Sequence, residues 1–158
     1  MFLRSPAILA DRVTHRSPTI NVRIDRLNFR SALVIEESTL LRGLLADYLK
    51  KRGWIAHGTS RVQQALPLLK CIPYHLIVAD SNLSGGSAIN FAHLLRHSEQ
   101  WSAIPLVLIT DSARATFVLD RNAAGAHEAR RSAWTADLAT ILADLESHGH
   151  WKRENYAN

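Results

Sequence analysis

Polar side chains follow three short apolar runs of this chain of 158 residues. Glu36 and Glu37 come directly after the run 32–35, Asp80 ends the run 75–80, and the run 106–109 is followed by Thr110. A carboxylate in such a place can attack phosphorus to form an acyl phosphate, and oxygen ligands around it can bind the hard cation that this reaction needs. The segments between these runs must therefore bring the polar side chains together.

The apolar runs alternate with segments of helical period, which is typical of repeated βαβ units. Ser38 is suited to cap the first helix, and Gly53 is suited to end it. Pro67 is expected to kink or shorten the second helix. The leucines of the first helix, Leu40 and Leu44 included, are expected on one face that packs on a sheet. The expected strands are 32–36, 54–57, 75–80, 106–110 and 127–130, and the expected helices are 38–52, 61–69, 87–97, 113–122 and 135–147.

This alternation predicts an α/β fold, namely a flavodoxin-like doubly wound domain with helices on both faces of a five-stranded parallel sheet in the order 2-1-3-4-5. In open parallel sheets, ligands bind outside the carboxyl ends of the strands, where the strand order reverses. The polar side chains after the first, third and fourth strands would then meet at one edge and form one site.

Charge and composition suggest three parts of the chain. The net charge is +5, of which +4 belongs to residues 1–30, so we expect a basic N-terminal extension there, a domain at 31–147 and a C-terminal tail at 148–158. The extension could contact nucleic acid or an anionic membrane surface, although a solvated arm is the simpler interpretation. Cys71 is the only cysteine, and no apolar run approaches the length of a membrane span, so we expect a cytoplasmic protein.

The order of these elements, with acids after the first strand, Asp80 after the third and Thr110 after the fourth, resembles the receiver domain of bacterial response regulators, over about residues 31–146. The matching pieces are the segment 32–38, the segment 76–80 with Leu83 and Gly85, the pair Ile109-Thr110, and the turn at 124–126. Each piece is weak alone, but their order and separation together favour this family.

The resemblance implies phosphoryl transfer from a phosphohistidine on a partner to Asp80, with Mg²⁺ as cofactor. Glu36, Glu37, Asp80 and the backbone carbonyl of Asn82 would bind the metal ion, and the hydroxyl of Thr110 would donate a hydrogen bond to the phosphoryl group. The implied partners are a sensor histidine kinase or a phosphotransfer protein, an effector protein of unknown kind, and, in a homodimer, a second copy of the chain.

The sequence departs from the family where the signal is passed on. The family has a lysine seven residues beyond the glycine of the turn, and counting from Gly125 gives Ser132. The switch aromatic, three positions before the lysine, is replaced by Ala129. Arg130 or Arg131 could supply the missing positive charge, although a planar guanidinium does not substitute freely for an ammonium group.

Two acidic residues are also unusual for the family. Glu37 stands where an aspartate is usual, and its extra methylene shifts the oxygen that an octahedral Mg²⁺ site must place accurately. Asp111 adds a negative charge next to Thr110, where a small residue is common. Both changes predict weakened metal binding and slower phosphorylation.

We therefore expect a stand-alone, atypical receiver that acts through protein–protein contacts, has no output domain and is not an enzyme beyond self-phosphorylation and slow autodephosphorylation at Asp80. The alternative is a pseudo-receiver, a binding module that works without phosphorylation. An aspartate-nucleophile phosphohydrolase is disfavoured because Asn82 stands where such enzymes have a second acid. Binding of nucleic acid through residues 1–30 is a further alternative, which a steep salt dependence would reveal.

Overall fold

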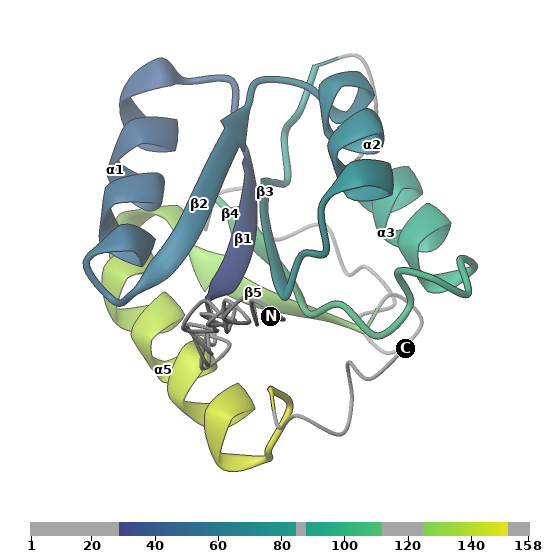
Figure 1. Cartoon of the computed structure of the whole chain (residues 1–158). Coiled ribbons are helices and arrows are strands. Elements are labelled where there is room, and N and C mark those ends of the chain that lie inside the picture. The colour runs from purple at the N-terminus through teal and green to yellow at the C-terminus, as the bar shows by residue number, and fades with distance from the viewer. Residues whose placement is uncertain (1–28, 85–87, 112–124, 152–158) are drawn as a thin grey trace, which may run out of the picture.

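The computed structural model describes residues 29–84, 88–111 and 125–151, and within them the chain forms a five-stranded parallel sheet in the order β2-β1-β3-β4-β5. The predicted fold class and strand order are thus confirmed (Figure 1). The strands are β1 (Arg30–Ile35), β2 (Trp54–Thr59), β3 (Leu76–Asp80), β4 (Leu106–Thr110) and β5 (Ala126–Arg130). The helices are α1 (Thr39–Lys50), α2 (Val62–Cys71), α3 (Ala88–Arg96) and α5 (Trp134–Ser147), with a short 3₁₀ turn η2 (Arg131–Ala133) before α5.

Two layers of helices enclose the sheet. Helices α1 and α5 cover one face, and α2 and α3 cover the other (Figure 1). Side chains of β1 alternate between the two faces: Leu33 and Ile35 pack with α2 and α3, whereas Ala32 and Val34 pack with α1 and α5. This alternation decides which polar side chains meet beyond the strand ends.

Helix α1 begins as the sequence predicts but ends at Lys50, two residues before the predicted end at Arg52. The Ser38 hydroxyl accepts a hydrogen bond of 3.3 Å from the backbone N–H of Leu41, and Gly53 follows the helix with a φ of +83°, which favours glycine. The predicted apolar face is too wide, however. Leu40 and Leu44 are 75% and 49% exposed, because the sheet contacts only the part of the helix that carries Leu45 and its neighbours.

Pro67 does not shorten α2, which runs from Val62 to Cys71 with the proline inside it. The helix continues past Pro67 because Ala65 and Leu69, on either side of the proline, are both buried against the sheet. Burial of this apolar face stabilises the turn that proline disfavours.

Three side chains meet at the amino end of the sheet, opposite the polar ends of β1 and β3. The Arg30 guanidinium lies 5.8 Å from the centre of the Trp54 ring and 4.9 Å from that of Trp151, and it forms an ion pair of 2.9 Å with Glu146. The two indoles pack edge to face, and the Trp151 indole N–H donates to the carbonyl of His75. The packed part of the chain therefore extends to Trp151, which we had expected to belong to the tail.

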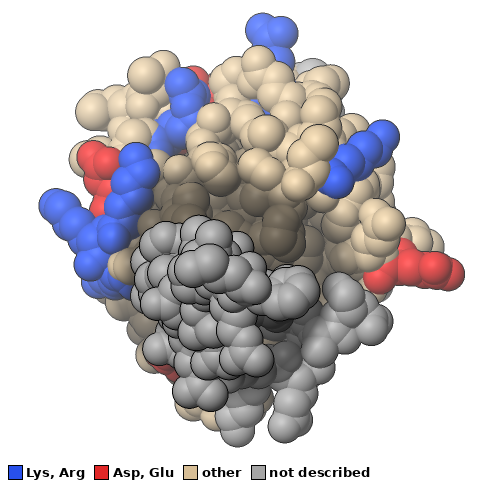
Figure 2. All heavy atoms as spheres, in the orientation of Figure 1, with Lys and Arg blue, Asp and Glu red and all other residues tan. Residues whose placement is uncertain are grey.

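The predicted helix 113–122, most of the extension 1–30 and the last part of the tail lie outside the described residues. None of the described helices has the length and apolar character needed to cross a membrane. On the face shown in Figure 2, the Lys and Arg side chains of the described residues gather at the edge of the molecule beside α1 and are otherwise scattered.

Candidate functional site

Asp80 and Glu36 lie together at the carboxyl end of the sheet. Asp80 ends β3 and Glu36 directly follows β1, and these two strands are neighbours, at the point where the strand order reverses. The alternation of side chains places Glu36 on the face of Val34 and Asp80 on the face of Val78, which is the face covered by α1 and α5. Both carboxylates are buried, with residue exposures of 2% and 7%.

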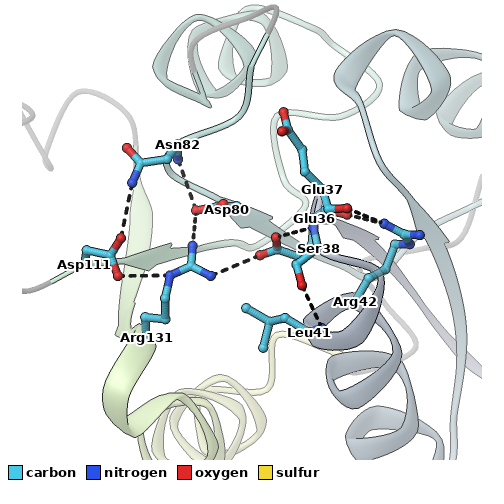
Figure 3. A network of polar contacts seen from close by, with 9 residues as sticks. All are labelled: Glu36, Glu37, Ser38, Leu41, Arg42, Asp80, Asn82, Asp111 and Arg131. Atoms are coloured by element: carbon cyan, nitrogen blue, oxygen red, sulfur yellow. Dashed lines mark hydrogen bonds and ion pairs between the residues drawn. The ribbon is translucent and has the colours of Figure 1, made fainter.

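The cation that accompanies these carboxylates is Arg131, the first residue of η2. Its Nη2 lies 2.5 Å from Asp80 Oδ1, its Nη1 lies 3.5 Å from Glu36 Oε2, and its Nε lies 3.0 Å from Asp111 Oδ1 (Figure 3). Each nitrogen of the guanidinium thus faces a different carboxylate. We call Glu36, Asp80 and Asp111 the acidic pocket.

The junction between β5 and α5 explains why Arg131 reaches the pocket. Strand β5 ends at Arg130, and the chain turns at once into η2, so that the next side chain points back over the ends of β3 and β1 (Figure 3). Asp137, in the first turn of α5, accepts hydrogen bonds from the backbone N–H and the guanidinium of Arg130, which fixes the backbone on one side of Arg131.

Burial and charge act in opposite directions in the pocket. Burial raises the pKa of Glu36, and the charge of Asp80 raises it further, whereas the Ser38 N–H and Arg131 lower it; the net effect is a raised pKa. Burial lowers the pKa of Arg131, but Asp80, Glu36 and Asp111 together raise it above its ordinary value. Arg131 therefore stays charged, and its charge partly neutralises the acids.

Four hydrogen bonds fix the ends of the strands beside the pocket. The backbone N–H of Asn82 donates to Asp80 Oδ1 at 3.1 Å, and the Asn82 side-chain amide lies 3.4 Å from Asp111 Oδ2. The guanidinium of Arg42, on α1, donates to the backbone carbonyl of Glu36 at 2.6 Å, and the Ser38 N–H donates to Glu36 Oε1 at 2.9 Å. These bonds orient both buried carboxylates (Figure 3).

Glu37 is not brought into the pocket. It lies in the bend between β1 and α1, where its carboxylate accepts hydrogen bonds from the backbone N–H and the hydroxyl of Ser84. Those bonds lower the pKa of Glu37. Figure 3 shows the Glu37 side chain directed away from Arg131.

The other predicted site residues, Thr110, Ser132 and Ala129, do not belong to the acidic pocket. The Thr110 hydroxyl donates to Glu128 Oε1 at 2.7 Å, so it is engaged with β5. Ser132 is exposed on η2, one position beyond the arginine that enters the pocket, and Ala129 is fully buried in the cluster beneath α1 and α5.

The arrangement of the acids does not fit a magnesium site. Among residues 29–84, 88–111 and 125–151, no three His, Cys, Asp or Glu side chains are grouped so that they could bind a metal ion. The Arg131 guanidinium lies between Glu36 and Asp80, and Glu37 is bound to Ser84. Mg²⁺ requires near-octahedral oxygen ligands at about 2.0–2.1 Å, and a bound guanidinium competes for the same oxygens.

Comparison with known proteins agrees with this architecture. The structure superposes on the chemotaxis response regulator CheY4 of Vibrio cholerae with a TM-score of 0.67 and 17% identity, covering 74% of this chain and 98% of that chain. It superposes on the receiver domain of a signal transduction histidine kinase from Syntrophus aciditrophicus with a TM-score of 0.70 and 19% identity, covering 82% and 97%. The chain has the fold of a response-regulator receiver domain.

A curated relative matches a shorter stretch of this receiver-like chain. The probable transcriptional regulator ycf29 of Cyanophora paradoxa is 30% identical over 78 residues, which are 49% of this chain and 37% of that protein. The match thus spans little more than a third of the relative's length. No protein-family model matches the chain.

Of the two arginines that the sequence offered as a source of positive charge, Arg131 enters the pocket, whereas Arg42 was not assigned from the sequence. The signal for Arg131 was present, because Arg130 and Arg131 both precede the position expected for the lysine. The contacts of Arg42 with the backbone of Glu36 had no signal in the sequence, since any helical residue one turn from the strand end could make them.

Proposed function

We propose that the chain is a receiver module of a two-component signalling system, that Asp80 is its phosphoacceptor, and that it acts through protein–protein contacts. The observation that carries this proposal is the position of Asp80. It is a buried carboxylate at the carboxyl end of β3, beside the point where the strand order of a receiver fold reverses.

The geometry of Asp80 supports a nucleophilic role. Both hydrogen bonds that we find on its carboxylate, from Arg131 and from the Asn82 N–H, fall on Oδ1, so within the described part of the chain Oδ2 is the oxygen available for attack. Attack on the phosphorus of a phosphohistidine would form the Asp–O–P bond and break the P–N bond, whose electron pair returns to the imidazole.

Arg131 is the cation placed to act in this transfer. A guanidinium can donate in parallel to two oxygens, so Arg131 could bind an oxygen of a phosphoryl group while it remains close to Asp80. We derive no step through Mg²⁺, because Glu36, Glu37 and Asp80 are not arranged to bind it. Under this proposal the module is a substrate of its partner and not an enzyme, apart from self-phosphorylation and slow autodephosphorylation.

The proposed partners follow from the chemistry. A histidine kinase or a phosphotransfer protein would supply the phosphohistidine, and an effector protein would bind the module. The curated relative bears the name of a probable transcriptional regulator, so control of transcription is one candidate output.

A second candidate function is binding without phosphorylation. It is favoured by the ion pairs that Arg131 already makes with Asp80 and Glu36, because the pocket is then neutralised in part before any phosphoryl group arrives. Ala129 in place of the family's switch aromatic points the same way, since a methyl group cannot change its exposure as a large ring does.

The test is chemical labelling followed by intact mass spectrometry. The full chain is incubated with acetyl phosphate or phosphoramidate, once with Mg²⁺ and once with a chelator, and the mass of one phosphate is sought. We expect an adduct in the native chain that is absent from Asp80→Asn. The matched control is Asp47→Asn, which removes an exposed carboxylate of α1 and should still be labelled. A native chain that takes up no phosphate under either condition contradicts the phosphoacceptor role and favours the second candidate.

A further inference from the structure

We propose that Arg131 is the resident cation of the acidic pocket and excludes divalent metal ions from it, so that the pocket gains affinity for Mg²⁺ only when Arg131 is removed. The inference deepens the proposed function by describing how Asp80 is charge-balanced, but it does not require Asp80 to be phosphorylated. Glu36, Glu37 and Asp80 are the acids that the resemblance implies as metal ligands, but their side chains are not arranged as a metal site.

All three nitrogens of the Arg131 guanidinium contact carboxylates. Nε, Nη1 and Nη2 of Arg131 contact Asp111, Glu36 and Asp80, at 3.0, 3.5 and 2.5 Å. A single planar cation thus contacts three carboxylates that come from three different strand ends, and its side chain is 29% exposed. A divalent ion close to Asp80 and Glu36 would have to lie next to this charge or displace it (Figure 3).

The backbone at Arg131 is fixed from outside the pocket. Arg130 donates three hydrogen bonds to Asp137, of 2.9, 2.9 and 2.8 Å, and η2 starts at the next residue. The backbone of Arg131 is therefore set by contacts that involve none of the pocket acids. A side chain attached to such a backbone loses less entropy when it binds in the pocket than one on a mobile loop.

A metal ion at this site would also lack one carboxylate ligand. Glu37 lies in the bend after β1 and is hydrogen bonded to Ser84, so the oxygen ligands on the side of Asp80 are fewer than the sequence suggests. Exclusion of Mg²⁺ therefore has two causes, a competing cation and a missing carboxylate. Removal of Arg131 cancels the first cause only.

The experiment measures metal binding and not phosphorylation, so the inference and the proposed function can fail separately. Mg²⁺ is titrated into the native chain and into Arg131→Gln by calorimetry, and the unfolding temperature of each is recorded with Mg²⁺ and with a chelator. We expect no binding and no thermal shift in the native chain. In Arg131→Gln we expect binding with a dissociation constant at least about tenfold below the lower limit that the titration sets for the native chain, since a like charge removed from a partly buried site changes binding by at least about 1.4 kcal/mol.

Control variants separate the pocket from general charge effects. Lys51→Gln removes one exposed positive charge beyond the end of α1 and should bind Mg²⁺ no better than the native chain. Arg131→Gln combined with Asp80→Asn should lose the gained affinity. If Arg131→Gln folds poorly, Arg131→Met, which keeps most of the stem, replaces it.

Paramagnetic broadening locates the site. Mn²⁺ added to the ¹⁵N-labelled Arg131→Gln chain should broaden the amide signals of Asn82 and Ser38 first, because these amides donate to Asp80 and Glu36. A native chain that binds Mg²⁺ as well as Arg131→Gln does, or a folded Arg131→Gln chain that gains no affinity, would overturn the proposal.

Discussion

The carboxylate of Asp137, in the first turn of α5, accepts three hydrogen bonds from Arg130, the last residue of β5. One of these bonds comes from the backbone N–H and two come from the guanidinium, so the bond pattern fixes both the main chain and the side chain of Arg130. The residue that follows is Arg131, which enters the acidic pocket. The position of the pocket cation thus depends on a carboxylate that does not itself belong to the pocket.

The first prediction concerns the stability of the fold at acidic pH. The side-chain hydrogen bonds from Arg130, followed by the one from its backbone, lower the pKa of Asp137 from 3.8 to about 2. A depressed pKa in the folded state means that the ionised carboxylate contributes stability above pH 3.8 and that this contribution is lost as the pH falls through about 2. Urea unfolding at a series of pH values should show the free energy of unfolding decreasing through this window.

The control for this effect is Asp137→Asn. The variant should be less stable than the native chain at neutral pH, and the difference between the two should shrink towards pH 2 because both then carry a neutral side chain. An unchanged difference across the window would mean that Asp137 contributes through its shape and not through its charge.

The second prediction concerns Trp151. Trp151→Ala should lower the free energy of unfolding by about 2–4 kcal/mol, because it removes an edge-to-face contact with Trp54, the stacking of Arg30 and a hydrogen bond to His75. Chemical denaturation followed by circular dichroism measures this loss. His148→Ala, which changes an exposed side chain of the same segment, should cost less than about 0.5 kcal/mol.

The third prediction concerns Gly125, which precedes β5. Its φ is +54°, and an added Cβ would lie 3.1 Å from Arg96 Nε, whose guanidinium donates to the Gly125 carbonyl. Gly125→Ala should therefore destabilise the fold by about 1–2 kcal/mol through backbone strain and displacement of Arg96. Thermal unfolding of the two chains gives the comparison.

Gly43 offers the opposite substitution as a control. It lies inside α1, and a Cβ built there meets nothing within 4 Å. Gly43→Ala should raise the free energy of unfolding by about 0.5–1 kcal/mol, since glycine loses more entropy than alanine in a helix. A destabilised Gly43→Ala would show that this surface of α1 makes a contact that the structure does not contain.

The fourth prediction concerns the lysine position of the family. Ser132 is exposed, so Ser132→Lys should leave the free energy of unfolding within about 0.5 kcal/mol of the native value and should not change labelling of Asp80. Arg131→Lys, in contrast, should change both the free energy of unfolding and the labelling of Asp80. An ammonium group cannot contact three carboxylates as the planar guanidinium does. Denaturant unfolding and intact mass spectrometry test the pair. Labelling that improves in Ser132→Lys would place the functional cation at 132.

Much of the fold was predictable because the local signals agreed. The apolar runs set β1, β3 and β4 nearly to the residue, and Ser38 caps α1 as expected. The burial of α1 was less predictable, since its leucines cover more of the helix surface than one sheet can contact. The exposed Leu40 shows that helical period alone does not give the width of a contact.

The site was predicted in part. Glu36 and Asp80 meet as predicted, whereas Glu37 lies in the bend after β1 and is hydrogen bonded to Ser84. The sequence could not decide between Arg130 and Arg131, because the count from Gly125 assumed the family's loop lengths, whereas η2 starts directly after β5 and places the pocket cation at Arg131, one residue before the counted position. Boundaries of weak strands such as β5 are the features that sequence patterns define least well.

The stacking of Arg30 against Trp151 has a use in protein engineering. The first residue of β1 and the last described aromatic residue lie within 4.9 Å of each other, guanidinium carbon to ring centre, at the end of the sheet remote from Asp80. A short linker could therefore join the two segments in a circular permutant, with new termini opened in the surface turn 98–103 between α3 and β4. Reporter proteins fused at those termini could then signal changes at the opposite end of the sheet without crowding it.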